Sequence, residues 1–322
     1  MRAEEILQLA QCFMESRILH AAAELDLFTT VSQTPLSAGE VAGKIGVDPR
    51  ALAVLLDAVT AMGLLVKRNG AYRCENSLLV AGSPDSVLPM VLHMSHLWTR
   101  WSRLPDVAKG LPAPELDFSR DREQLRAFIG AMHSIGAPLA KRIVEAVDPG
   151  QAEALLDVGG GSGTYTIAFL RAVPRMRATI FDLPEVIEMA RERLAQEGLL
   201  ERTTLVPGSF YQDELPRRND LVLISAIIHS NSLEENLELY QKSFRALNPG
   251  GRILIRDHVM DRDRIHPKEG AVFAINMLVG TSGGGTYTYE EIEAGLKEAG
   301  FSNIRLLHQG EHMDAVVEAF KP

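Results

Sequence analysis

Cysteine is scarce in this sequence, and its two thiols stand far apart. Cys12 lies in an amphipathic stretch and Cys74 beside an expected hairpin, so neither belongs to a CxxC pair. This spacing excludes a disulfide framework and a cysteine-rich metal site. It fits a reducing compartment, and we expect the protein in the cytoplasm.

Long apolar runs and an excess of positive charge are also absent. No run of about 18 apolar residues is present to span a bilayer, and the N-terminal MRAEEILQLAQ carries acids where a signal peptide has an apolar core. The formal net charge of -9 disfavours a partner held through phosphate contacts. We therefore expect a soluble protein with neither a membrane nor a nucleic acid as partner.

Residues 1–86 follow the order helix, turn, helix, hairpin. Asp48 can cap the second helix, and Asn69-Gly70 forms a hairpin turn between two short strands. This is the outline of a winged helix, a fold that often binds DNA. The second helix offers only Arg50 as a cation among alanine, leucine and valine, so we expect a packing or dimerisation domain.

Residues 87–150 are expected to form a helical segment that links two domains. This segment holds both tryptophans of the chain and several methionines at helical spacing. Such a pattern usually indicates a core, and a pocket for a flat organic ligand is the alternative. His93 and His96 lie three residues apart, but no third ligand follows at a metal-site spacing, so we assign no metal.

Residues 151–322 alternate strand-like runs with helical ones. The strands are expected at EALLDV, RATIFDL, TTLVPG, DLVLISAII, GRILIRDHV, FSNIRLLHQ and DAVVEAF. This alternation predicts a doubly wound α/β domain, a mostly parallel sheet with helices on both faces, closed by the last two strands. The ligand of such a domain lies at the carboxyl ends of the strands.

A glycine-rich turn, in LLDVGGGSGT, follows the first of these strands. Its spacing is GxGxG and not the dinucleotide GxGxxG, because Thr164 takes the third glycine position, and Asp157 ends the strand. A carboxylate there suits an ammonium and a sulfonium better than a pyrophosphate. No Lys-Ser/Thr pair follows the loop, which excludes a P-loop. We therefore predict S-adenosylmethionine as the cofactor, bound by Asp157, Gly159, Gly160 and Gly161.

Asp182 ends the next strand, about 20 residues after the loop, where an acid can accept hydrogen bonds from ribose hydroxyls. Its alternative role is that of a helix N-cap before Pro184. In the later PGSFYQ segment, Phe210 would face the adenine and Ser209 would make a polar contact. The predicted cofactor set is completed by Leu183, Gly208 and Ser225.

The motifs LLDVGGGSGT, FDLPEV, ALNPGGRILIRD and GGGTYTYEEIEAGLKEAGF occur in one chain. With them the sequence resembles the S-adenosylmethionine-dependent O-methyltransferases of the plant caffeate and acetylserotonin type, which have many bacterial relatives in secondary metabolism. The resemblance covers essentially the whole chain. It implies a winged-helix dimerisation domain at 1–86, a substrate-pocket segment at 87–150 and a Rossmann-like, seven-stranded catalytic domain at 151–322. It also implies a homodimer that methylates a small aromatic or conjugated hydroxyl compound.

In that family a histidine after the fourth strand deprotonates the acceptor hydroxyl, and the matching residue is His229 in IIHSNSLEEN. An imidazole ordinarily titrates near neutral pH and can take a proton from a phenol; a polar strand-end or helix-capping residue is the alternative. Family members follow this histidine with Asp and Trp, where Ser230 and Asn231 stand here. They also place Glu at the positions of Asp257 and Thr286. Asp257 is thus the one carboxylate partner that the resemblance leaves for the base.

The acceptor pocket is expected to draw on the helical segment and on the family's substrate-facing helix. Its predicted residues are Met94, Trp98, Phe128, Met132, Asn276 and Met277. The loss of acidic partners around His229 keeps a second function open, in which a relative binds S-adenosylmethionine but catalyses decarboxylation, hydroxylation or a pericyclic step. A DNA-binding regulator and a non-catalytic protein with a relic glycine loop are further alternatives.

Overall fold

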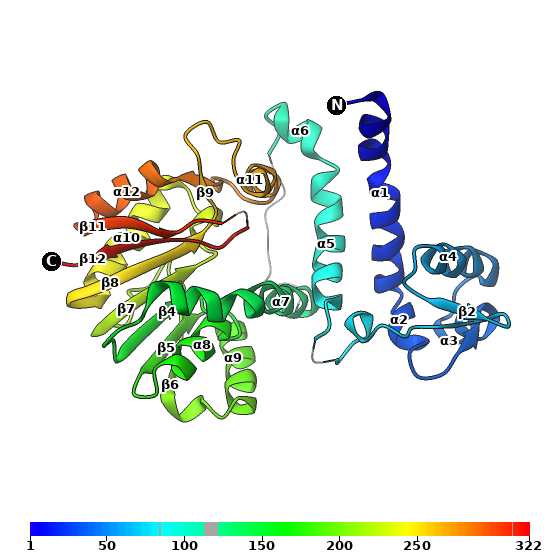
Figure 1. Ribbon diagram of the computed structural model, residues 1–322, viewed down its shortest axis with the longest axis horizontal. Coiled ribbons are helices and arrows are strands. Elements are labelled where there is room, and N and C mark those ends of the chain that lie inside the picture. The colour runs from blue at the N-terminus through cyan, green and yellow to red at the C-terminus, as the bar shows by residue number, and fades with distance from the viewer. Residues whose placement is uncertain (84, 113–121, 311) are drawn as a thin grey trace. The chain divides into compact units, whose positions relative to one another are not determined.

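The computed structural model describes residues 1–83, 85–112, 122–310 and 312–322, and the chain divides into two compact units (Figure 1). The first unit comprises Met1–Thr99 and Phe118–Ser134, and the second comprises Arg100–Asp117 and Ile135–Pro322. Two helices continue from one unit into the other: α5 (Leu88–Trp101) and α7 (Arg122–Val147). Within the described ranges, no helix combines the length and the apolar character that a bilayer crossing requires.

The first unit is mainly helical and carries one small sheet. Its other helices are α1 (Ala3–Glu24), α2 (Leu27–Thr30), α3 (Ala38–Ile45), α4 (Pro49–Ala61) and the short η1 (Ser77–Leu79). Its strands are β1 (Leu36–Ser37), β2 (Val66–Arg68) and β3 (Ala71–Arg73), paired in the order β1-β3-β2. Their shared core includes Phe28, Val41, Leu56 and Tyr72.

Local signals set the boundaries of these elements. Oδ1 of Asp48 accepts a hydrogen bond from the backbone N–H of Ala51 at 2.7 Å, which caps α4. Asn69 and Gly70 both have positive φ, at 51° and 79°, and close the β2–β3 hairpin. The predicted order of two helices followed by a hairpin is confirmed.

The second unit is built on a mixed sheet. Its strands are β4 (Ala154–Val158), β5 (Arg177–Asp182), β6 (Thr203–Pro207), β7 (Asn219–Ser225), β8 (Leu247–Asp257), β11 (Ser302–His308) and β12 (Ala315–Phe320). Their order across the sheet is β11-β12-β8-β7-β4-β5-β6. Strands β4 to β8 run parallel, while β12 is antiparallel to both β8 and β11. The predicted seven-stranded, doubly wound sheet is confirmed.

Helices cover both faces of this sheet (Figure 1). The helices that pack against its strands include α8 (Thr164–Ala172), α9 (Pro184–Gln196), α10 (Leu233–Ala246) and α12 (Tyr289–Glu298). The unit also contains α6 (Leu104–Ala108), α11 (Lys268–Gly280) and the short η3 (Leu200–Arg202) and η4 (Ile228–Ser230). A separate parallel pair is formed by β9 (Val259–Met260) and β10 (Tyr287–Thr288). Leu155 and Leu156 are adjacent on β4 yet belong to different core clusters, as alternation along a strand buried on both faces requires.

Candidate active site

His229 lies on η4, four residues beyond the end of β7, which corrects the expectation that the strand DLVLISAII runs up to it. The strand stops at Ser225, and Ala226 then adopts φ 58°, in the left-handed region. That conformation turns the chain out of the sheet, and the next residues form a short 3₁₀ turn. His229 therefore sits in the connection between β7 and α10, at the carboxyl edge of the sheet.

Asp257, at the carboxyl end of β8, meets the imidazole of His229. Nδ1 of His229 lies 2.9 Å from both Oδ1 and Oδ2 of Asp257, and the two residues are 8% and 1% exposed. Burial acts to raise the pKa of Asp257, but the charge and hydrogen bond of His229, the charge of Arg256 and the backbone N–H of His258 together lower this pKa. A charged carboxylate at Nδ1 favours the tautomer with its proton on Nδ1, which leaves a lone pair on Nε2.

The glycine turn after β4 is closely packed on one side and open on the other. A Cβ on Gly159 would lie 2.5 Å from Cδ1 of Ile227, and a Cβ on Gly160 would lie 2.9 Å from Cγ of Asp157. By contrast, a Cβ on Gly161 would meet no atom within 4 Å, although φ there is 57°. The turn thus presents bare backbone at an open side, as a ligand bound through close backbone approach requires.

Two carboxyl groups lie under and beside this turn. Oδ2 of Asp157 accepts a hydrogen bond from Oγ1 of Thr166 at 2.6 Å. Oδ2 of Asp182 accepts one from the backbone N–H of Gly161 at 2.8 Å, whereas the N-cap of α9 is Leu183, so Asp182 is not that cap. Burial raises the pKa of each carboxyl to about 6, and the charge of Asp182 adds to the effect on Asp157. Such a pair is suited to a ligand that brings a cation and hydroxyl donors.

The other predicted cofactor residues lie around the same turn. The N–H of Gly208 donates to the carbonyl of Asp182 at 2.9 Å, and Phe210 comes within 3.8 Å of the Cβ position of Gly159. The backbone N–H of Ser209 is held by Asp213 at 2.8 Å. Leu183 is 45% exposed at the start of α9.

Ser225 ends β7 and is hydrogen-bonded to a buried cation. Its Oγ accepts from Nε of Arg256 at 2.7 Å, and the guanidinium carbon of Arg256 lies 5.0 Å from the centre of the Tyr165 ring. Tyr165 belongs to α8, the helix that the glycine turn begins. Arg256 thus joins the carboxyl ends of two strands to the start of the cofactor helix.

Helix α11 places an aromatic side chain against His229 and a polar one against Trp101. The ring of Phe273 packs edge-on against His229 with centroids 4.8 Å apart, and it lies 5.2 Å from His258. Oδ1 of Asn276 accepts from Nε1 of Trp101 at 2.9 Å. Sequence reasoning missed Phe273, His258 and Trp101 as site candidates. Phe273 could have been found, because it stands one helical turn before Asn276 on the same face.

The remaining predicted pocket residues divide between the two units. Met277 lies on α11 in the second unit and is 7% exposed. Met94, Trp98, Phe128 and Met132 belong to the first unit. There the centre of the Trp98 ring lies 6.0 Å from the guanidinium carbon of Arg17 and 6.3 Å from the centre of the His20 ring. Their part in an acceptor pocket stays a prediction.

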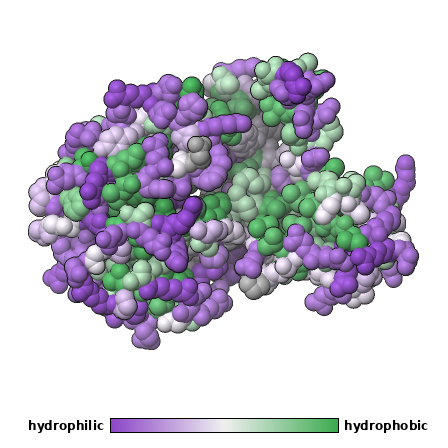
Figure 2. Space-filling view, in the orientation of Figure 1, coloured by the Kyte–Doolittle hydropathy of each residue, from purple (hydrophilic) through white to green (hydrophobic). Residues whose placement is uncertain are grey.

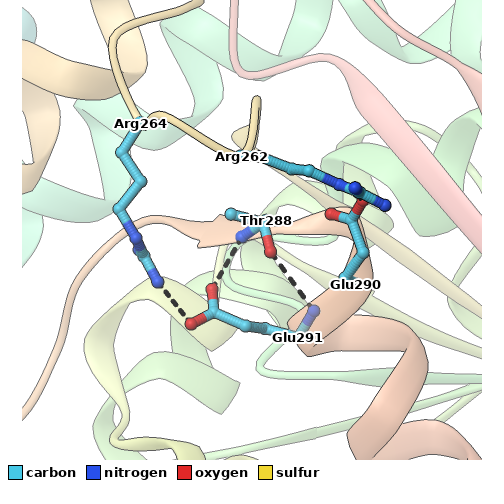
Figure 3. Close-up of a pocket in the computed structure, with 5 residues that line it drawn as sticks. All are labelled: Arg262, Arg264, Thr288, Glu290 and Glu291. Atoms are coloured by element: carbon cyan, nitrogen blue, oxygen red, sulfur yellow. Dashed lines mark hydrogen bonds and ion pairs between the residues drawn. The ribbon is translucent and has the colours of Figure 1, made fainter.

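Two surface cavities have none of the predicted site residues in their lining. One of about 570 Å³ lies between α11 and residues 283–287. The other, of about 260 Å³, is lined by the charged groups in Figure 3. There the carboxylate of Glu291 accepts from the backbone N–H of Thr288 at 2.9 Å, as an α12 capping box, and it pairs with Arg264. Nη1 of Arg264 also donates to the carbonyl of Thr286 at 2.8 Å, so these charges fix the chain that precedes α12.

Comparison with known proteins identifies the family of this chain. The family model described as the O-methyltransferase domain matches residues 107–302, and the one described as the O-methyltransferase dimerisation domain matches residues 7–78. The chain belongs to the S-adenosylmethionine-dependent O-methyltransferase family. The family predicted from the sequence motifs is confirmed.

Individual relatives of this methyltransferase span nearly its whole length. It is 32% identical to the tetracenomycin polyketide synthesis 8-O-methyl transferase TcmO of Streptomyces glaucescens, over 94% of this chain and 92% of TcmO. It is also 32% identical to the 3-hydroxy-5-methyl-1-naphthoate 3-O-methyltransferase of Streptomyces sahachiroi, over 92% of this chain and 89% of the relative. Human N-acetylserotonin methyltransferase, solved in complex with S-adenosylmethionine, is 26% identical with a TM-score of 0.85, over 100% of this chain and 98% of the human one. S-adenosylmethionine is therefore the cofactor of this methyltransferase.

Proposed function

We propose that this methyltransferase methylates a hydroxyl group of a small aromatic or conjugated compound, with His229 as the general base. The observation that carries the proposal is the buried contact between Nδ1 of His229 and the carboxylate of Asp257 at 2.9 Å. The relatives support an aromatic acceptor, since one of them is a 3-hydroxy-5-methyl-1-naphthoate 3-O-methyltransferase.

The pair can remove the acceptor proton as the oxygen reacts. Asp257 accepts the Nδ1 proton of His229, which orients the ring and leaves Nε2 free to take a proton from the acceptor hydroxyl. A phenol has a pKa of about 10, so few molecules are ionised at neutral pH, and loss of the proton makes the oxygen a much better nucleophile. The negative charge of Asp257 then stabilises the imidazolium that forms.

The second unit offers a set of groups that fits the cofactor. Bare backbone at the glycine turn, the buried Asp157 and the half-buried Asp182 match a ligand with an ammonium, a sulfonium and ribose hydroxyls. The adenine of the cofactor would be bordered by Gly208, Ser209 and Phe210. When bound, the cofactor would supply an electrophilic methyl group for the acceptor oxygen, with its sulfur as the leaving group.

We also propose that the enzyme is a cytoplasmic homodimer. The match to a dimerisation domain supports the dimer, and α1 exposes Leu7, Leu9 and Phe13 by 62%, 67% and 55%. In this proposal residues 1–86 dimerise, 87–150 help to form the acceptor pocket and 151–322 bind the cofactor and carry the base.

A turnover assay tests the role of His229. Purified enzyme, S-adenosylmethionine and a panel of phenols, naphthols and conjugated enols are incubated, and S-adenosylhomocysteine is measured. The change His229→Ala should lower kcat by about 100-fold or more, while calorimetry finds the Kd for S-adenosylmethionine nearly unchanged. Phe301→Leu, in the core behind α12, is a control for general destabilisation. Wild-type turnover in the His229 variant would remove this residue from the mechanism.

A further inference from the structure

The turn that carries His229 is attached to α10 by a buried pair of asparagines. Asn231 is 0% exposed and Asn236 is 2% exposed. Nδ2 of Asn231 donates to Oδ1 of Asn236 at 3.1 Å, and Nδ2 of Asn236 donates to the carbonyl of Ile228 at 2.9 Å. The amide chain therefore begins just after η4 and returns to the first residue of η4, so it closes around His229.

Two other segments of the second unit bind the same short stretch. The hydroxyl of Tyr211 donates to Oδ1 of Asn231 at 2.6 Å, and the hydroxyl of Tyr287 donates to the carbonyl of Asn231. The backbone N–H of Gly285 donates to the carbonyl of His229 at 2.9 Å. A Cβ on Gly284 would lie 2.4 Å from that carbonyl oxygen, so this approach of two backbones needs a glycine.

Such a network is costly to bury, and its place in the fold suggests what it does. An amide side chain taken from water into a core destabilises the fold unless its hydrogen bonds are remade. Here they are remade at a stretch that has little regular structure, since η4 has three residues and follows the left-handed Ala226. The backbone ladder alone would leave this turn poorly fixed. The asparagines add side-chain hydrogen bonds to the two backbone bonds that close η4, from Ser230 to Ile227 and from Asn231 to Ile228.

We propose that Asn231 and Asn236 are positioning residues for His229. They hold the backbone of η4 so that Nδ1 of His229 stays in hydrogen-bond reach of Asp257, which fixes both the ring and its tautomer. The expected effect on turnover rests on the proposed function of His229 as the base. A displacement of about 1 Å at a catalytic group can cost on the order of 100-fold in rate.

Asn236→Leu removes both hydrogen bonds of that amide and keeps the number and branching of the side-chain heavy atoms. We expect kcat to fall by about 10- to 100-fold, with the Kd for S-adenosylmethionine within about twofold of wild type. The matched control is Asn219→Leu. Asn219 is 4% exposed at the start of β7, at the other end of the strand, and its amide binds the carbonyls of Pro216 and Ala246. This control should lose comparable stability and keep kcat within about twofold.

A spectroscopic measurement separates positioning from stability. The ¹⁵N shifts of labelled histidine should show the Nδ1–H tautomer of His229 in the wild type and in Asn219→Leu, and a mixture of tautomers in Asn236→Leu. If Asn236→Leu does not fold, Tyr211→Phe serves instead, because it removes one hydrogen bond from a half-exposed side chain. A wild-type tautomer and wild-type kcat in the folded variants would overturn the proposal.

A double variant distinguishes failure of this proposal from failure of the proposed base. If Asn236 acts through His229, then Asn236→Leu should change kcat by less than about twofold in a His229→Ala background. An equal loss in both backgrounds would show a structural role only and overturn the positioning. Full turnover in His229→Ala alone would overturn the base, and the tautomer measurement would still decide whether the asparagines orient the ring.

Discussion

Asp157 is buried and Asp182 is half-buried, and desolvation raises the pKa of each carboxyl group to about 6. A raised folded-state pKa means that these groups favour the folded protein at low pH, and that this contribution is lost as the pH rises through 6. A cationic ligand reverses this balance because it favours the ionised carboxylates. Ionisation of the two carboxyl groups is therefore unfavourable in the free protein and becomes favourable when a cationic ligand binds.

The affinity for S-adenosylmethionine should consequently rise with pH. Between pH 5 and pH 7 we expect Kd to fall by about tenfold for each carboxyl that must ionise, and to level off above pH 7. Isothermal titration calorimetry across this range measures the effect. Asp263→Asn, at an exposed site, is a control that should keep the same dependence of Kd on pH. An affinity independent of pH would mean that neither carboxyl changes ionisation on binding.

The contact between Asp257 and His229 leads to a second prediction. Asp257→Asn keeps the shape of the side chain but removes the charge that selects the Nδ1–H tautomer, so kcat should fall by about 10- to 100-fold. The Kd for S-adenosylmethionine should stay within about twofold. Turnover measured beside calorimetry checks both, and a variant that loses affinity but keeps kcat would assign Asp257 to cofactor binding.

Helices and strands with a regular pattern of apolar residues could be predicted from the sequence, whereas irregular turns and buried polar contacts could not. All seven strands of the large sheet could be predicted, because runs of apolar residues are bounded by turn residues and alternate with helical segments. The end of β7 could not be, because alanine at φ 58° carries no sequence signal. The amide chain of Asn231 and Asn236 also escaped prediction, since a polar residue beside a helix start usually indicates solvent or a cap.

The glycine turn after β4 is packed so closely that a side chain at Gly159 should weaken both cofactor binding and the fold. Gly159→Ala would place a Cβ 2.5 Å from Ile227 at a φ of 65°, so it should weaken S-adenosylmethionine binding by at least about tenfold and cost about 1–3 kcal/mol of stability. Gly39→Ala is the matched control, because it lies in α3 with no atom within 4 Å of its Cβ position. That control should be neutral or stabilise by about 0.5–1 kcal/mol. Calorimetry measures the Kd of both variants and thermal unfolding measures their stability. Equal values for the two variants would contradict the prediction.

Among the residues that the structure describes, exposed large hydrophobic side chains are most frequent on α1. Ile6, Leu7, Leu9, Phe13 and Met14 of this helix are between 48% and 67% exposed. In Figure 2 the unit that contains α1 shows green, hydrophobic side chains among purple polar ones. A surface of this kind usually belongs to an interface, which agrees with the matched dimerisation domain. The sequence predicted this role from the scarcity of cations in the winged helix.

Charge placed on α1 should therefore weaken self-association. We expect the wild type to sediment as a dimer and the double variant Leu9→Glu, Phe13→Glu to dissociate at micromolar concentrations, because each glutamate would have to be desolvated in the interface. Val54→Glu, on α4 and 67% exposed, is the control that should keep the dimer. A wild-type monomer in analytical ultracentrifugation would refute the proposed assembly.

The two tryptophans give each unit its own optical reporter. Trp98 belongs to the first unit, against Arg17 and His20, whereas Trp101 belongs to the second and donates its indole N–H to Asn276 on α11. In a Trp98→Phe enzyme all indole emission comes from Trp101. Its intensity and wavelength then follow events around α11 alone, so acceptors can be screened by fluorescence quenching in the absence of any turnover.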